Sequence, residues 1–295
     1  MPPSEVIVFD DASDDGTRDV VDALASASTV PIFFRQQAEN RGVIGNFESA
    51  IQATTGDIVL LSDQDDVWYP QKISKVLETF GRDPAIGLVF SDADLVDANL
   101  KPLGRTLWQS IGFNEAERAQ IRSPFAFDLL LRRFLCTGAT LAFRRSLLDV
   151  VLPLSKHLIH DAWIALAVSA ISKIECIDEP LIQYRQHDGQ QIGERAKMRN
   201  WWTQINAARQ MGAEYFERQL AFFRDLSTRV ANHERDWVHS EVGRLAAEKV
   251  VHLEYRIAVR QHRLASIGTV VGQYLSGRYS RFSYGWKSAA QDLFL

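Results

Sequence analysis

Cysteine, long apolar runs and a signal-like N-terminus are scarce or missing in this sequence. Its two cysteines, Cys136 and Cys176, lie in apolar surroundings without the spacing of a metal site. They are typical of buried free thiols in a reducing compartment. No apolar run approaches the roughly 20 residues of a membrane span, and no basic segment followed by an apolar one opens the chain. We therefore expect a cytosolic protein.

Several nucleotide and metal motifs are also missing. The turn at residues 40–46 has no Gly-Lys-Ser/Thr, which excludes a P-loop and leaves only a weak phosphate-cradle signal. Ala12 stands where a phosphatase-type Asp-x-Asp motif needs an acid. The same loop starts like a calcium loop but closes on Asp22 instead of Glu. A nucleotidyltransferase would carry a glycine-rich, basic signature near the first strand, and none is visible.

The composition is that of an ordinary globular protein with an uneven charge distribution. Of the 295 residues, 46% are hydrophobic and 24% are charged, and the net charge is −4. Residues 195–295 contain 16 basic and 9 acidic residues, a net of +7, so the preceding part carries −11. A basic C-terminal region suits an anionic lipid surface, although Arg-rich surface helices account for it equally well. The acidic body argues against a nucleic-acid partner.

Strand and helix patterns alternate through the first two thirds of the chain. β-branched or apolar segments at residues 5–9, 30–35, 58–61, 86–90, 136–143 and 173–177 predict strands, with helical periodicity between several of them. This alternation predicts an α/β fold with a mostly parallel sheet flanked by helices. From residue 195 onward the pattern is amphipathic and helical.

Acidic residues gather where predicted strands end. Asp63, Asp65 and Asp66 follow the apolar run 58–61, and Asp10 and Asp11 follow the first strand. Closely spaced carboxylates repel one another unless a cation or proton neutralises them, and Mg²⁺ binds carboxylates together with substrate phosphates. The first cluster therefore predicts a metal site, with a solvated acidic turn as the alternative. The pair at the first strand is suited to a base or ribose.

Asp161 opens a predicted helix and is a candidate general base. A helix N-terminus lowers the pKa of such an acid, while a nearby anionic diphosphate raises it. The alternative is a plain helix N-cap.

Taken together, these segments resemble the family 2 inverting glycosyltransferases. The resemblance rests on the motifs at residues 6–17, 40–42, 56–68 and 160–163, which occur in the family's order, and covers roughly residues 4–193. Asp-Gln-Asp-Asp-Val-Trp at 63–68 and Tyr-Arg-Gln-His at 184–187 are similar to a bacterial rhamnosyltransferase-like branch. The resemblance implies a GT-A fold over residues 1–193, a helical region at 194–295, a nucleotide-diphosphate sugar donor and a divalent metal, Mg²⁺ or Mn²⁺.

The resemblance also assigns roles to individual residues. Asp161 would deprotonate the acceptor hydroxyl, and Asp65 would coordinate the metal. The remaining residues are expected to bind the donor: Asp10 and Asp11 at its base or ribose, Asp63 along the ribose, Arg185 and His187 near the diphosphate, and Ser13, Asn40 and Gly42 as further donor-binding residues.

The implied function is sugar transfer with inversion to a saccharide or lipid-linked acceptor, in bacterial surface polysaccharide synthesis. Residues 278–287 interleave aromatic and basic side chains, which favours peripheral contact with the inner face of the membrane, although core packing accounts for the aromatics as well. Family members usually start with a further strand and a Thr-Tyr-Asn-type loop before the segment that begins here at Glu5. Three interpretations of their absence stay open: Met1 is a wrongly placed start, the sequence is a fragment, or the chain is degenerate and has lost donor binding. The competing hypothesis is therefore a non-catalytic scaffold or interaction protein.

Overall fold

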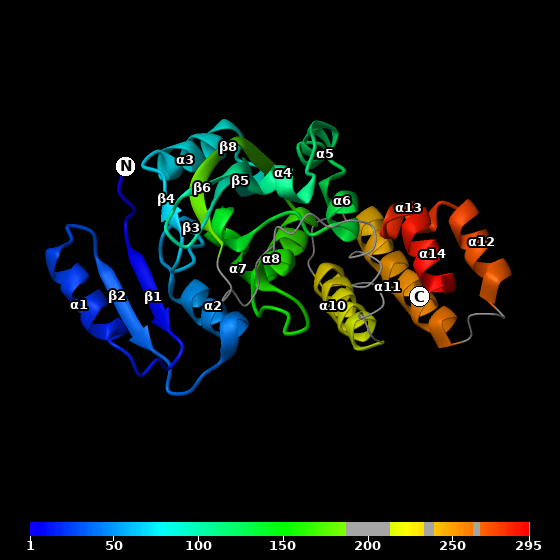
Figure 1. Cartoon of the computed structure of the whole chain (residues 1–295), viewed down its shortest axis with the longest axis horizontal. Coiled ribbons are helices and arrows are strands. Elements are labelled where there is room, and N and C mark those ends of the chain that lie inside the picture. Colours follow the sequence, from blue (N-terminus) through cyan, green and yellow to red (C-terminus); the bar gives the residue numbers. More distant parts are fainter. Residues whose placement is uncertain (187–212, 233–238, 262–265, 295) are drawn as a thin grey trace.

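The computed structural model describes residues 1–186, 213–232, 239–261 and 266–294. An N-terminal unit, a central sheet with its helices, and a group of C-terminal helices follow one another along the longest axis (Figure 1). Among the described helices, none combines the length and the apolar character that crossing a membrane requires.

The N-terminal unit alternates strands and helices around a small parallel sheet. Its elements are β1 (Val6–Asp10), α1 (Thr17–Ala27), β2 (Ile32–Gln36) and α2 (Gly42–Ala53), and β1 pairs with β2 in parallel. Apolar side chains of α1 are exposed: Val20 is 60% and Leu24 is 58% accessible. A sheet of two strands is too narrow to cover them.

The central sheet follows the order β3-β7-β5-β8-β4, with β6 added to β5. Its strands are β3 (Ile58–Leu60), β4 (Val67–Trp68), β5 (Ile86–Val96), β6 (Pro102–Thr106), β7 (Leu141–Arg144) and β8 (Lys173–Arg185). The predicted α/β class with a helical C-terminal region is confirmed. The pairing is mixed instead of mostly parallel, because only β5–β8 in this sheet is parallel and the other pairs are antiparallel.

Two strands extend beyond their predicted bounds. β5 continues past Phe90, so Asp92 and Asp94 lie within it and not after its end. β8 joins two predicted segments across Pro180, which sits opposite Asp92 at a register shift. A proline fits at such an irregularity because no regular ladder bond is required of it.

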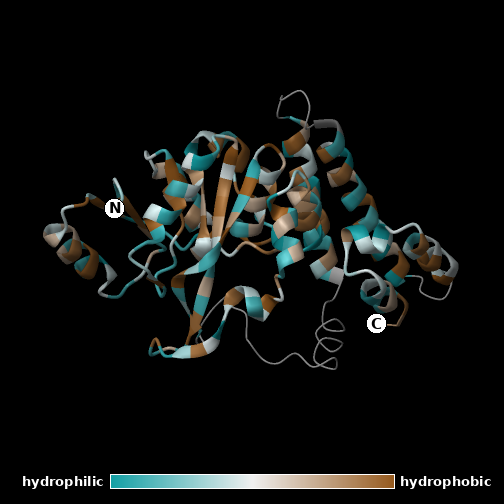
Figure 2. Cartoon of the chain, turned by 90° about the horizontal axis from the view of Figure 1, so that it is seen from above, coloured by the Kyte–Doolittle hydropathy of each residue, from teal (hydrophilic) through white to brown (hydrophobic). Residues whose placement is uncertain are grey.

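Short helices surround the sheet, and most of them bury one face against it. They are α3 (Lys72–Arg82), α4 (Leu107–Ile111), α5 (Glu115–Ile121), α6 (Ala126–Arg132), the 3₁₀ turns η1 (Gly138–Thr140) and η2 (Arg145–Leu147), α7 (Leu148–Val151) and α8 (His160–Ser169). Every residue of α8 is buried, and in Figure 2 apolar residues run along the central strands that it covers. Cys136 and Cys176 are buried free thiols, as predicted.

The C-terminal helices continue the central core. They are α10 (Ala213–Ala231), α11 (His239–Gln261), α12 (Ile267–Leu275), α13 (Arg278–Phe282) and α14 (Trp286–Phe294). Phe222 of α10 packs edge-on against Trp163 of α8 with 5.6 Å between ring centroids. The predicted division at residues 193 and 194 lies outside the described residues and stays a prediction.

Candidate active site

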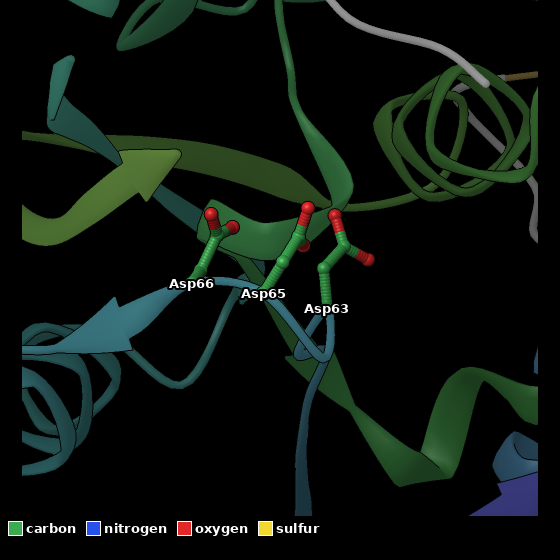
Figure 3. A group of neighbouring side chains, drawn as sticks. All are labelled: Asp63, Asp65 and Asp66. Atoms are coloured by element: carbon green, nitrogen blue, oxygen red, sulfur yellow. The ribbon is translucent and has the colours of Figure 1, made fainter. Parts of the chain in front are cut away.

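Three carboxylates converge on the loop between β3 and β4. Asp63, Asp65 and Asp66 offer oxygens that all lie within 4.8 Å of one another, and Figure 3 shows the three side chains rising from the same side of the loop. Burial raises the pKa of Asp66 to about 7, and the charges of Asp63 and Asp65 add to this effect. Burial also raises the pKa of Asp63. The loop therefore brings together three carboxylates whose charged forms repel one another.

This acidic loop fits a hard divalent cation. Oδ2 of Asp66 is buried and has no hydrogen-bond partner in the described structure. Such an oxygen is costly to bury unless a ligand meets it. Carboxylate oxygens are the ligands that Mg²⁺ and Mn²⁺ prefer. The structure thus brings Asp63 and Asp66 beside Asp65, the residue that the family resemblance assigns to the metal.

Arg185, at the end of β8, hydrogen-bonds to the acidic loop. Its backbone N–H donates to Oδ1 of Asp66 at 2.9 Å, and its Nε donates to the carbonyl of Asp65 at 2.6 Å. Nη1 donates to the carbonyl of Ala98 at 2.5 Å. The donor-binding residue predicted here therefore lies beside the carboxylates and fixes their backbone. His187, its predicted companion, lies outside the described residues.

Asp161 is a buried carboxylate near the start of α8. It is the second residue of the helix, and Ile159 occupies the N-cap, so the plain N-cap alternative is wrong. Its Oδ2 accepts a hydrogen bond from the backbone N–H of Gly138 at 3.0 Å, and its Oδ1 accepts one from Ala162 at 2.7 Å. Burial nevertheless raises the pKa of Asp161 to about 6. The charge of Asp161 also raises the pKa of Asp63, which places the two carboxylates within electrostatic reach.

Lys72 belongs to this site, although the sequence analysis did not single it out. It is 1% exposed on the first turn of α3, and its Nζ donates to the carbonyl of Ala139 at 2.7 Å. Nζ also lies 3.8 Å from the centroid of a Trp68 ring. Burial lowers its pKa to about 7, against the opposing pull of Asp66 and Asp63. Lys72 lies four residues before Val76, which is on the apolar face of the helix. This spacing places both side chains on the same face and could have indicated that Lys72 is buried.

The predicted nucleotide-binding residues form a second group at the ends of β1 and β2. Asp10 accepts a hydrogen bond from the backbone of Ser13 at 2.8 Å, and Asp11 accepts one from the backbone of Arg41 at 2.7 Å. The side chain of Asn40 accepts from the backbone of Gly42 at 3.1 Å. Gly42 has φ +71°, a conformation that favours glycine. The structure therefore brings all five predicted residues of this group into one turn-rich surface.

Helix α2 connects the two groups. It begins at Gly42 beside Asp11, and Asn46 donates to the carbonyl of Phe9 at 2.8 Å. The next residue, Phe47, stacks its ring on His160, with 4.1 Å between centroids and 16° between planes. His160 immediately precedes Asp161, so a single helix contacts the predicted nucleotide end and the residue next to the predicted base.

Comparisons with known proteins identify the family of this chain. The family model for glycosyl transferase family 2 matches residues 1–152. An uncharacterised glycosyltransferase of Nostoc sp. is 30% identical over 197 residues, which are 62% of this chain and 56% of that protein. An uncharacterised protein of Mycobacterium tuberculosis is 26% identical over 194 residues, 63% of this chain and 51% of that protein. The chain thus spans about half the length of these curated relatives.

A solved structure supports the fold. Residues 1–349 of S. aureus TarS are similar to this chain with a TM-score of 0.52 and 14% identity, over 98% of this chain and 70% of that one. At this identity the likeness concerns architecture alone, a GT-A-like α/β fold. The sequence match establishes the family as well as the fold, because the family model covers just over half of the 295 residues. The chain belongs to glycosyl transferase family 2.

Proposed function

We propose that this chain transfers a sugar from a nucleotide-diphosphate donor to an acceptor hydroxyl, with inversion, in a single displacement. The observation that supports this best is the pairing of a buried carboxylate with a raised pKa, Asp161, with the acidic loop at Asp63, Asp65 and Asp66. A base whose pKa lies close to the working pH combines a useful ionised fraction with proton affinity. An acidic loop nearby suits a cation that faces a diphosphate.

In this reaction Asp161 accepts the proton of the acceptor hydroxyl. The hydroxyl oxygen forms a bond to the anomeric carbon of the donor while the bond from that carbon to the diphosphate oxygen breaks. The nucleoside diphosphate leaves with the bonding electron pair, and Asp161 carries the proton. A divalent cation held by Asp63, Asp65 and Asp66 would supply positive charge where negative charge develops on the leaving group.

The other donor contacts remain part of the proposal. The turn-rich surface formed by Asp10, Asp11, Ser13, Asn40 and Gly42 would bind the base and ribose, while Asp63, Arg185 and His187 would lie toward the ribose and diphosphate. Asp10 and Asp11 each accept a backbone hydrogen bond and, as carboxylates, keep capacity to accept more from a ligand.

Calorimetry with UDP, GDP and dTDP, each with Mn²⁺ or with EDTA, tests the proposed function. We expect at least one of the three to bind in the presence of Mn²⁺ and to lose that binding in EDTA. The non-catalytic alternative predicts a folded chain that binds none of them. Cation-independent binding would instead remove the role assigned to the acidic loop.

The transfer rate should fall in acid through the titration of Asp161. Because burial raises its pKa to about 6, the carboxylate is mostly ionised at pH 7 and mostly protonated at pH 5. Only the ionised form accepts a proton, so we expect kcat/KM at saturating Mn²⁺ to fall about tenfold from pH 7 to pH 5. A flat profile over this range would contradict the assignment of the base.

The acceptor and the setting also belong to the proposal: a saccharide or lipid-linked acceptor, in surface polysaccharide synthesis at the inner face of the membrane. Two features of the C-terminal helices support a peripheral lipid contact. Ile267, Val271, Tyr274 and Leu275 are exposed on α12. Residues 255–291 contain no Asp or Glu, and Arg281 and Lys287 are exposed nearby in the chain. An exposed apolar face next to basic side chains is typical of binding to anionic lipid.

Leu275→Glu should weaken lipid binding. Leu275 is 77% exposed, so a charge there leaves the core intact while opposing insertion into an anionic surface. We expect binding to phosphatidylglycerol vesicles in a sedimentation assay to fall about tenfold. Val20→Glu, which makes the same charge change at an exposed residue of α1, should leave binding unchanged. Equal binding by all three proteins, or none by the parent chain, would contradict this part of the proposal.

A further inference from the structure

His160 is a buried side chain whose hydrogen bonds are unmet. The residue is 6% exposed, and within the described structure neither Nδ1 nor Nε2 has a hydrogen-bond partner. A buried polar atom without a partner costs stability. The stacking of the ring on Phe47 contributes packing but satisfies neither nitrogen. Such a group in an active site indicates a ligand that the protein alone does not supply.

The ring is adjacent in the chain to the predicted base and within electrostatic reach of the acidic loop. It precedes Asp161 on α8, and the charge of Asp63 acts on it. Gly138 gives it room: a Cβ at that position would come within 2.9 Å of Nε2. The backbone N–H of the same glycine donates to Asp161. Because Gly138 has no side chain, it leaves space for the His160 imidazole, and its N–H orients the Asp161 carboxylate.

The charge state of the imidazole narrows the class of ligand. Burial lowers the pKa of His160 to about 4, so the ring is neutral at physiological pH. A neutral imidazole offers one N–H donor and one acceptor nitrogen. A diphosphate oxygen only accepts hydrogen bonds and favours cations, whereas a hydroxyl group both donates and accepts. The one donor and one acceptor of the neutral imidazole therefore match the hydroxyl groups of a sugar better than the oxygens of a diphosphate.

We propose that His160 is a specificity-determining residue that hydrogen-bonds a hydroxyl of the sugar being transferred. The inference rests on the proposed function and names a contact within it. Both nitrogens are closed off from solvent in the ligand-free chain, so the ring or a wall of the site shifts as the sugar enters. The residue acts on the sugar alone, and the nucleotide end of the site stays independent of it.

Two variants test this contact. His160→Phe keeps a ring for stacking on Phe47 but removes both nitrogens, and His160→Gln keeps one donor and one acceptor without the ring. We expect His160→Phe to melt at the same temperature as the parent chain or higher, because two unmet polar atoms disappear from the interior. Its Mn²⁺-dependent binding of UDP or GDP should stay within about threefold, since His160 does not contact the nucleotide.

Turnover should respond differently from nucleotide binding. With the nucleotide-hexose that the parent chain uses, kcat/KM of His160→Phe should fall about 10- to 100-fold, the range for losing a hydrogen bond to a sugar hydroxyl. Its preference between donors that differ in configuration at one carbon, such as UDP-glucose and UDP-galactose, should narrow. His160→Gln should recover part of the loss. A purely structural role would lower the melting temperature and nucleotide binding together.

The outcomes separate this inference from the proposed function. Full activity and unchanged donor preference in a folded His160→Phe, with an active parent chain, would overturn the contact and leave the function standing. A fall in melting temperature and in nucleotide binding for both variants would also overturn it. Failure of the parent chain to release a nucleoside diphosphate from any donor would overturn the function and this inference with it.

Discussion

Asp161→Asn should reduce sugar transfer by about 10²- to 10⁴-fold while donor binding stays within about threefold. The amide keeps the shape of the side chain and can accept one hydrogen bond, from Gly138 or Ala162, but it cannot take a proton from the acceptor hydroxyl. Steady-state rates give the first quantity, and calorimetric titration of the donor gives the second. Asp22→Asn, an exposed acid on α1, is the matched control and should be fully active.

The same variant has a stability signature that distinguishes lost chemistry from misfolding. Burial raises the pKa of Asp161 in the folded chain to about 6, so folding favours its protonated form. The stability linked to this proton is present below the ordinary pKa of about 4 and is lost as the pH rises through 6. At pH 8 the ionised carboxylate therefore opposes folding by roughly 1–3 kcal/mol.

Asp161→Asn should accordingly unfold at the same temperature as the parent chain or higher at pH 8, with little difference at pH 4. A variant that is less stable at pH 8 and inactive would show a structural role instead. An active, stable variant would remove Asp161 as the base.

Asp65→Ala should abolish cation-dependent donor binding, with a loss of at least about 100-fold. Asp65 is the central carboxylate of the acidic loop, and its loss takes away one ligand and one negative charge. The same charge raises the pKa of Asp63 and Asp66, so these two acids should titrate at lower pH in the variant. The variant would then resemble the parent chain in EDTA.

Donor titrations with and without Mn²⁺ measure this effect. Asp57→Ala, an exposed acid six residues before Asp63, makes the same change of charge outside the acidic loop and should bind donor normally. Tight Mn²⁺-dependent binding by Asp65→Ala would show that the cation is held elsewhere. Loss of binding in both variants would point to a general effect of charge.

Local sequence patterns predicted the elements of this fold better than their pairing. The apolar runs at 58–61 and 86–90 are present as β3 and the first part of β5, since each follows from the pattern of its own residues. The antiparallel pairing of β7 between β3 and β5 is set by contacts between distant segments. No local pattern encodes such contacts. The sequence therefore predicted a mostly parallel sheet where the pairing is mixed.

The acidic residues of the candidate site stood out in the sequence, whereas Lys72 and the role of His160 did not. The acids of the 63–66 loop were predicted because carboxylates so close together at the end of an apolar strand need a cation or a proton to offset their repulsion. Lys72 was not singled out, and His160 was noted only as part of the motif at 160–163, because the importance of both lies in their burial. The Nζ of Lys72 meets a carbonyl 67 residues away, and the partner of His160 in stacking comes from α2. Only the folded chain brings these groups together.

The C-terminal helices illustrate the same limit. Their amphipathic periodicity predicted helices and an apolar face, but not what covers that face. In the structure Phe216, Phe222 and Phe223 are buried in the core that also holds α6 and α8. Helix α10 of the predicted helical region is thus packed on the helix that carries Asp161.

The central claim is that the acidic loop and Asp161 together move a sugar off a nucleotide diphosphate. Release of nucleoside diphosphate from a panel of UDP-, GDP- and dTDP-sugars, measured with Mn²⁺ and with EDTA for the parent chain and Asp161→Asn side by side, tests it most directly. We predict that the parent chain with Mn²⁺ releases nucleoside diphosphate from at least one donor. We predict no release by the parent chain in EDTA and none by Asp161→Asn. Equal release by Asp161→Asn, or none by a folded parent chain from any donor, would contradict the claim.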